Sequence, residues 1–182
     1  MNITAMYFTG TGTTKKVTAA IADELTEIKI SQDETAAGEN PGSIKAGINP
    51  WQRAEDIDFT PPAARREIYR FTPDDLVVFG VPVIAGRVPN VLLKFLDTLQ
   101  GGGALAVPVV LYGNRNFDDA LIELRNILQD RGFYAIGAAA FIGEHSFSRI
   151  LAAGRPDSSD MELSRDFARK LAGKIRRRGW AA

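Results

Sequence analysis

Short apolar runs divide the chain at regular intervals. Three of them, at residues 3–8, 75–80 and 106–112, predict buried strands, because a run of this length bounded by turn residues is typical of a strand covered on both faces. Residues 134–143 supply a last strand. Pro108 fits the third run only near its start, since proline donates no hydrogen bond to a sheet.

Between the runs, apolar residues recur every three or four positions, which is the spacing of an amphipathic helix. The pattern predicts helices at residues 13–28, at about 90–99, from Asn116 onward and at about 159–178. Asn116 is expected to cap the third of these. The stripes expected to face the core contain Val17, Ile21, Leu25, Ile28, Leu121, Leu124, Leu128, Leu163, Phe167, Leu171 and Ile175.

Strands that alternate with helices predict an α/β fold, a doubly wound five-stranded parallel sheet of order 2-1-3-4-5 with helices on both faces. The edge strand beside the first is weakly marked: residues 57–60 fit it, and residues 27–30 compete for it. The chain, residues 1–182, is expected to form a single domain. A polar segment at about 31–54, rich in Gly and Pro, is interpreted as an inserted loop or arm, in which Trp51 either anchors the arm or covers a ligand.

Composition narrows the function. Lys plus Arg and Asp plus Glu both total 22, so the formal net charge is zero and nucleic acid is not an expected partner. The absence of cysteine excludes disulfides, iron–sulfur ligation and thiol nucleophiles, so redox chemistry would need a bound cofactor. No basic leader precedes a long apolar segment, and no run reaches the roughly 18 apolar residues of a membrane span. A cytoplasmic protein with no membrane partner is expected.

The first strand leads into a helix through Thr9-Gly10-Thr11-Gly12-Thr13-Thr14, a loop suited to binding an anion. Glycine lets the backbone approach a ligand closely, threonine hydroxyls donate hydrogen bonds, and the first N–H groups of the next helix point the same way. Lys15 occupies the third small position of a dinucleotide fingerprint, and no glycine precedes Lys-Ser or Lys-Thr as in a nucleoside triphosphate loop. The alternative is an ordinary turn in which Thr13 or Thr14 caps the helix.

Two further loops are expected to meet the first. Residues 82–89 and 113–119 follow the predicted third and fourth strands, and ligands of doubly wound sheets bind outside the carboxyl ends of the strands, where the winding direction reverses. Each loop contains Gly or Pro, and none contains the side chains of a catalytic triad. The three loops therefore predict one crevice for a planar cofactor.

The pattern T-x-T-G-x-T at residues 9–14 resembles the phosphate loop of the flavodoxin family. Residues 82–89, 112–121 and 144–148 resemble segments of a flavodoxin-like family often fused to a ferredoxin module, which this cysteine-free chain lacks. The resemblance covers nearly all of the chain outside about residues 31–54. It implies FMN as cofactor, with its phosphate at the first loop and its isoalloxazine ring held by backbone groups of the other two. The residues that it assigns to FMN are Thr9, Gly10, Thr11, Gly12, Thr13, Thr14, Pro82, Val83, Ile84, Ala85, Gly86, Arg87, Gly113, Asn114, Arg115, Phe117 and Asp119.

The sequence departs from the family at one ring contact. Members often carry Tyr-Gly or Tyr-Ala where this chain has Ile84-Ala85, so aromatic stacking on that side is lost. Stacking on an aromatic ring helps flavodoxins to destabilise reduced flavin, so the resemblance does not imply a very low reduction potential here. Phe117 either covers one face of the ring or packs under the helix that follows it.

Three basic side chains near these loops have two interpretations each. Arg87 and Arg115 either place positive charge near the edge of the flavin or are solvated. His145, the one histidine of the chain, has a structural or surface role or donates to the flavin or a substrate. A single histidine does not make a metal site, and Asp118 and Asp119 are explained as helix caps.

The resemblance implies an FMN-binding redox protein that transfers electrons to a redox partner protein or reduces a small-molecule acceptor. As an enzyme, it would be an FMN-dependent oxidoreductase using NAD(P)H. Dedicated carriers of the family are generally strongly acidic, whereas this chain is neutral. The alternative, from another class, is a flavin-free regulatory or scaffold domain of the same fold that binds a phosphate-bearing ligand. The sequence leaves the oligomeric state open.

Overall fold

The three apolar runs form the centre of a parallel sheet. A computed structural model describes the protein over residues 1–28, 51–148 and 150–180. In it, β1 (Asn2–Tyr7), β4 (Asp75–Pro82) and β5 (Leu105–Tyr112) lie side by side in that order, and both pairings are parallel. Successive residues of a strand face opposite sides of the sheet, and here both sides are buried, which explains why the runs are apolar throughout.

Short strands continue the sheet at both edges. β2 (Gln52–Arg53) and β3 (Ile57–Asp58) pair with β1, whereas β6 (Tyr134–Ala135) and β7 (Ala139–Ile142) pair with β5. Taken as two interrupted edge strands, they give the predicted order 2-1-3-4-5 and confirm the α/β class. The strand predicted at residues 57–60 is present, in a shorter form.

Each edge strand contains one residue more than the strand beside it. Asn2 pairs with Gln52 but Met6 pairs with Ile57, so the edge uses an extra residue over the same stretch, and the same shift occurs beside β5. The extra residue forms a bulge that interrupts the ladder of hydrogen bonds. The continuous strand predicted at 134–143 is therefore two pieces, and residues 52–53, which the sequence assigned to the arm, belong to the sheet.

Pro108 lies in the middle of β5 rather than near its start, and the interruption beside it explains why. Ile136 N donates to Ala106 O and Gly143 N donates to Tyr112 O, each at 3.0 Å, so the even-numbered residues of β5 face the edge strand. Pro108 faces the stretch between β6 and β7, where the ladder is already broken. Its missing N–H therefore costs no hydrogen bond there.

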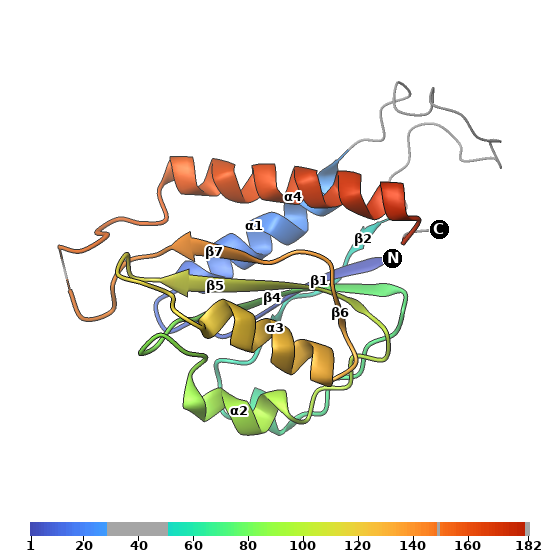
Figure 1. Cartoon of the computed structure of the whole chain (residues 1–182), viewed down its shortest axis with the longest axis horizontal. Helices are drawn as coiled ribbons and strands as arrows, with labels where there is room; N and C mark the ends of the chain where they lie inside the picture. Colours follow the sequence, from blue (N-terminus) through green and yellow to red (C-terminus); the bar gives the residue numbers. More distant parts are fainter. Residues whose placement is uncertain (29–50, 149, 181–182) are drawn as a thin grey trace.

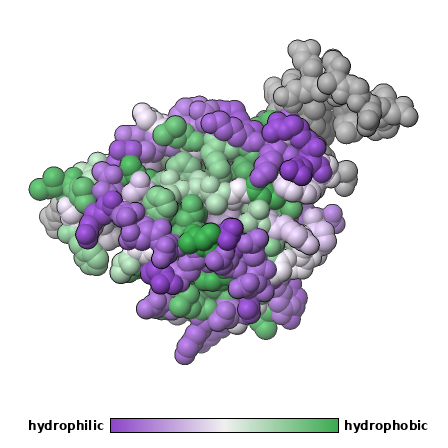
Figure 2. Space-filling view, viewed as in Figure 1, coloured by the Kyte–Doolittle hydropathy of each residue, from purple (hydrophilic) through white to green (hydrophobic). Residues whose placement is uncertain are grey.

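In the described parts of the chain, four α-helices cover the two faces of the sheet (Figure 1). α1 (Thr13–Glu27) and α4 (Ser158–Arg178) pack on one face, α2 (Asn90–Leu96) and α3 (Ala120–Asp130) on the other, each over its own apolar cluster. Polar side chains cover much of α4 in this view, while hydrophobic surface projects where the connection from β7 to α4 lies (Figure 2). None of the described helices is long and apolar enough to cross a membrane.

Two details of the predicted helices are wrong. The third helix begins at Ala120, and Asn116 Oδ1 accepts from Asp118 N at 3.1 Å, so it serves the loop and does not cap the helix. Leu163, which was expected to face the core, is 59% exposed. Small side chains fill the inward positions near the start of α4 and let it approach α1, a pattern that hydropathy does not mark; its buried residues include Met161, Ser164, Ala168, Leu171 and Ile175.

Trp51 anchors the chain at the end of the sheet away from the ligand loops. Its ring is buried in the cluster beneath α1 and α4, and the guanidinium of Arg176 lies 5.5 Å from the ring centroid. The next residue, Gln52, donates from its backbone N to Met1 O at 3.0 Å, which places Trp51 at the amino ends of the strands. Anchoring is thus confirmed over ligand covering. The rest of the predicted arm, residues 31–50, lies outside the described residues.

Gly80 of β4 lets α1 pack directly against the sheet. A Cβ atom here would lie 2.1 Å from Thr18 Oγ1 and 2.9 Å from Thr14 Cγ2, so any side chain would push the helix away. Thr18 donates its hydroxyl to Thr14 O at 2.8 Å, which satisfies this buried polar group within the helix. The contact fixes the first turns of α1 against β4.

A largely buried ion pair fixes the start of α4. Arg155 donates from Nε and Nη2 to the carboxylate of Asp160, a residue only 3% exposed. Asp157 completes a capping box: its side chain accepts from the N–H groups of Ser159 and Asp160, and Asp160 accepts from Asp157 N at 2.9 Å. Because Arg155 stabilises the carboxylate, the pKa of Asp160 is held below its ordinary 3.8.

We expect Asp160→Asn to lower the free energy of unfolding by about 1 to 3 kcal/mol at neutral pH, because charge-assisted hydrogen bonds are lost at a buried site. A lowered pKa means that the carboxylate stabilises the fold above its ordinary pKa and loses this contribution as the pH falls through the folded value. The deficit of the variant should therefore shrink at about pH 3. Urea denaturation at the two pH values measures it.

Asp166→Asn is the matched control, because Asp166 pairs with Arg169 on the exposed side of the same helix. Its effect should stay within about 1 kcal/mol, as for other surface ion pairs. An Asp160→Asn deficit that is equal at both pH values would contradict the prediction.

Candidate functional site

The carboxyl ends of β1, β4, β5 and β7 open onto one cavity of about 320 Å³. The three loops that the sequence expects to meet all contribute to its wall. The predicted residues that line it are Gly10, Thr11, Thr13, Thr14, Pro82, Val83, Ile84, Ala85, Gly113 and Arg115. The predicted residues outside its lining are Thr9, Gly12, Gly86, Arg87, Asn114, Phe117 and Asp119.

The first loop ends at a helix without a side-chain cap. Gly12 precedes α1 in the left-handed conformation, with φ 88°, and no side chain caps the helix, so the interpretation of Thr13 or Thr14 as a cap is wrong. Thr9 Oγ1 accepts from Gly12 N at 2.9 Å and closes the loop, and the hydroxyls of Thr11 and Thr13 lie 3.2 Å apart. The first N–H groups of a helix have no partner within it. The loop therefore presents N–H and hydroxyl donors that suit an anion.

The second loop turns back on itself at Ala85 and Gly86. Ile84 N donates to Arg87 O at 3.0 Å and Arg87 N to Ile84 O at 3.1 Å. The two central residues have positive φ, 51° for Ala85 and 73° for Gly86, as in a two-residue type I′ turn. Alanine is strained in this conformation, and strain of this kind is concentrated at functional sites. The turn leaves Ile84 and Ala85 in the cavity wall.

The third loop touches the second. At Gly86, a Cβ atom would lie 2.3 Å from Asp118 Oδ2, so only glycine allows the two loops to pack this closely. Phe117 packs against the core on the α2–α3 side, and its ring centroid lies 5.4 Å from that of Tyr112. Phe117 is thus part of the support of the loop, whereas Tyr112 lines the cavity.

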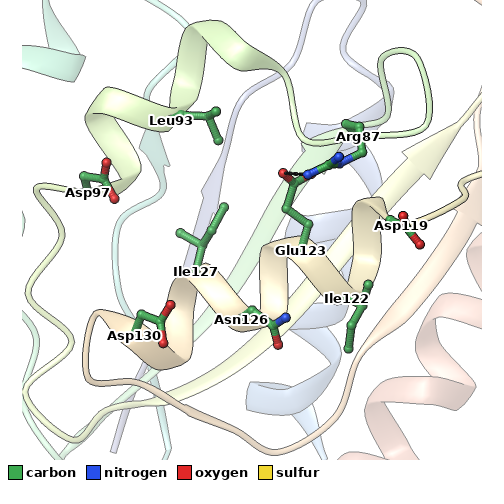
Figure 3. Close-up of a pocket in the computed structure, with 9 residues that line it drawn as sticks. All are labelled: Arg87, Leu93, Asp97, Asp119, Ile122, Glu123, Asn126, Ile127 and Asp130. Atoms are coloured by element: carbon green, nitrogen blue, oxygen red, sulfur yellow. Dashed lines mark hydrogen bonds and ion pairs between the residues drawn. The ribbon is translucent and has the colours of Figure 1, made fainter.

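Arg87 points toward Glu123 of α3 (Figure 3), and it does not line the cavity at the strand ends. Its Nη2 and Nε donate to the Glu123 carboxylate at 2.6 and 2.9 Å, and Val88 N donates to the same carboxylate at 2.8 Å. The guanidinium holds the pKa of Glu123 below its ordinary 4.5. The pair ties the base of the second loop to α3.

A second, open cavity of about 480 Å³ lies between α2 and α3. Arg87 and Asp119 line it, together with the carboxylates of Asp97 and Asp130 (Figure 3). Asp119 directly precedes α3 and makes no side-chain hydrogen bond to the helix. Two residues that the resemblance assigns to FMN thus belong to this groove and not to the cavity at the strand ends.

A fourth segment, residues 143–147, completes the first cavity, and it is also lined by Phe8, which directly follows β1, and by Leu111 and Tyr112 of β5. His145 packs against Gly113, where a Cβ atom would lie 2.6 Å from His145 Cδ2. For His145, donation to the flavin or a substrate was one of two interpretations, whereas the other residues were not assigned to the site from the sequence, although segment 144–148 carried part of the resemblance. The rule that ligands bind at the carboxyl ends of strands also identifies this segment, since Gly143 directly follows β7.

The lining differs in character along the cavity. Threonine hydroxyls and backbone N–H groups gather at the first loop, while apolar side chains such as Val83, Ile84 and Leu111 form the other walls. Arg115 and Glu144 are its charged residues, and neither makes an ion pair within the described chain. Among the described residues, no group of three or more His, Asp or Glu side chains is placed to hold a metal ion. The arrangement suits a ligand with an anionic group at one end and a flat apolar body.

No model of a known protein family matches the sequence, and no curated protein sequence matches it. Solved structures do match. A flavodoxin from the domain Archaea aligns over 97% of this chain and 99% of its own, with a TM-score of 0.57 and 13% identity. Oxidised flavodoxin 1 from Bacillus cereus aligns over 95% of this chain and 98% of its own, with a TM-score of 0.59 and 17% identity.

The apo form of an NADH:FMN oxidoreductase aligns over 94% of this chain and 88% of its own, with a TM-score of 0.57 and 17% identity. Identities this low establish the arrangement of the elements and nothing finer. The similarity to these structures agrees with the strand order 2-1-3-4-5 and with the resemblance seen in the sequence. The chain therefore has the flavodoxin fold.

Proposed function

We propose that this protein binds FMN in the cavity at the strand ends and transfers electrons through it to a redox partner protein or a small-molecule acceptor. The observation that carries the proposal is the uncapped, threonine-lined start of α1 beside an apolar cavity. Structural neighbours described as flavodoxins and as an NADH:FMN oxidoreductase support it.

The first loop fits the phosphate of FMN. The hydroxyls of Thr11, Thr13 and Thr14 and the first N–H groups of α1 supply donors, and Gly10 and Gly12 leave open space where side chains would crowd the phosphate. No positively charged side chain lines this end of the cavity in the described chain. The phosphate charge is then balanced by N–H and O–H dipoles and by the positive end of the helix.

The second and third loops fit the isoalloxazine ring. Pro82, Val83 and Ala85 offer backbone groups and small side chains, and Tyr112 and Gly113 close the wall between β5 and β7. Arg115 is the one cationic side chain of the described lining and is exposed at its rim. It is the residue suited to stabilise negative charge at the edge of a reduced ring.

FMN, when bound, carries electrons between a donor and an acceptor. The chain itself binds the phosphate, orients the ring between three loops and excludes water from its inner edge. An electron carrier and an NAD(P)H-dependent reductase both fit this division of work, and the two differ in whether a nicotinamide reaches the ring.

Thr11→Val with Thr14→Val should weaken FMN binding by about 1 to 3 kcal/mol, because the phosphate oxygens lose hydroxyl donors while the shape of the loop is kept. Quenching of flavin fluorescence in a titration measures the dissociation constant. Thr26→Val is the matched control: Thr26 lies near the far end of α1, donates its hydroxyl to Asp23 O within the helix, and does not line the cavity. Unchanged FMN affinity in the double variant would remove the first loop from the site.

Glu123→Gln should weaken FMN binding several-fold, because the second loop loses the carboxylate that holds Arg87 and Val88 N. Glu162→Gln is the control, since Glu162 forms exposed ion pairs on α4 with Arg165 and Arg169. The unfolding midpoint of each variant shows whether the fold persists. Equal affinities for the two variants would mean that the Arg87–Glu123 pair does not position the loop.

The visible spectrum of the protein distinguishes the two functions. FMN should show a perturbed flavin spectrum on binding, because the ring leaves water for an apolar cavity. Bleaching by anaerobic NADH or NADPH would identify a reductase, whereas binding without bleaching would identify a carrier that needs a protein donor. If FMN does not bind, the proposal fails, and a flavin-free domain that binds another phosphate-bearing ligand is favoured.

A further inference from the structure

Phe147 is the most exposed large apolar residue in the described chain, at 95%, and it lines the cavity at the strand ends. It belongs to the connection from β7 to α4, where hydrophobic surface projects from the molecule (Figure 2). Removing a phenylalanine ring from water is favourable, so its exposure at a cavity rim points to a ligand that covers it.

His145 holds the turn that carries Phe147. The Phe147 N–H donates to His145 Nδ1 at 3.1 Å, and the two rings meet edge to face with centroids 6.3 Å apart. His145 in turn packs against Gly113 of the third loop, which is possible because Gly113 has no side chain that would clash with it. Phe147 is thus tied through His145 to a loop that borders the same cavity.

Ile84 supplies the corresponding apolar side chain from the second loop. It is 54% exposed and lines the same cavity. At the carboxyl end of β5, β4 pairs on one side and β7 on the other, so Ile84 and Phe147 approach the cavity from opposite sides of the β5 end. A flat ring between them would cover both side chains.

We infer that Phe147 is a flavin-contacting residue, covering the isoalloxazine ring from the β7 side, with His145 as the residue that positions it. The inference rests on the proposed FMN function and deepens it, because it assigns the aromatic contact that Ile84 does not provide to a segment outside the three loops. An aromatic ring prefers an offset stack or an edge contact with another ring, and both bury apolar surface.

The test compares Phe147→Ala with Ile150→Ala in FMN titrations of the full chain. Ile150 is 90% exposed, lies three residues further along the same connection and does not line the cavity, so it controls for the loss of any exposed apolar side chain there. Phe147→Ala should raise the dissociation constant of FMN about 10- to 100-fold, as loss of an aromatic stack does elsewhere, with Ile150→Ala unchanged.

Phe147→Trp gives a readout that does not depend on affinity. The chain already contains Trp51 and Trp180, so the emission added by the new tryptophan is measured as the difference from wild type. FMN should quench most of this added emission and bind with near wild-type affinity. Emission that FMN leaves unquenched would place residue 147 away from the ring.

Two variants of His145 test the positioning role. Asparagine accepts a hydrogen bond from the N–H two residues on, as Nδ1 does here, whereas alanine does not. His145→Ala should weaken FMN binding and reduce the shift of the flavin spectrum, and His145→Asn should recover most of both. Equal losses in the two variants would overturn this role.

The outcomes separate the inference from the proposed function. If wild type does not bind FMN, the proposed function fails, and the inference that rests on it fails as well. If wild type binds FMN and Phe147→Ala binds equally well, or loses no more than Ile150→Ala, the inference is overturned while the proposed function stands.

Discussion

The close approach of α1 to β4 at Gly80 is the contact on which the site depends. Thr14 and Thr18 occupy the space that a side chain at Gly80 would fill, so α1 packs close to the backbone of β4. The chain must then pass from β1 into α1 through a tight loop, and the positive φ of Gly12 makes that possible. The donors at the start of α1 face the carboxyl ends of the strands for this reason.

The walls of the cavity are braced by one another as well as by the core. Gly86 admits Asp118, which joins the second loop to the third, and Gly113 admits His145, which joins the third to the segment after β7. Each joint needs a residue without a side chain on one side. A displacement of one loop therefore displaces the loop packed against it. The shape of the cavity depends on all of these segments together.

Patterns that depend on local spacing were predictable from the sequence. Buried runs gave the strands, and the order of strands and helices gave the parallel sheet and the meeting of three loops at one edge. The direction of a side chain was not predictable where its partner is distant. Arg87 turns to Glu123, 36 residues away, and no local signal marks that choice.

Other differences between the sequence-based expectations and the structure also arise from contacts between residues that are distant in the sequence. The bulges are set by how two strands match, and neither strand alone carries that information. The buried face of α4 includes Ser164 and Ala168 because α1 lies close to it, while hydropathy favoured Leu163. His145 and Phe147 joined the site through a contact with Gly113 that becomes visible only when the last strand is in place.

The interrupted edge strands have a consequence for how molecules of this protein meet in solution. An open sheet exposes unpaired N–H and C=O groups along its outer strands, and a long flat edge would accept a strand from another copy. Here β2 and β3 on one edge, and β6 and β7 on the other, are each no more than four residues long, and an extra residue separates the two pieces of each edge. Among the described residues, neither edge offers a long continuous template, a feature that disfavours pairing with the sheet of another copy, while the strand ends stay open for a ligand.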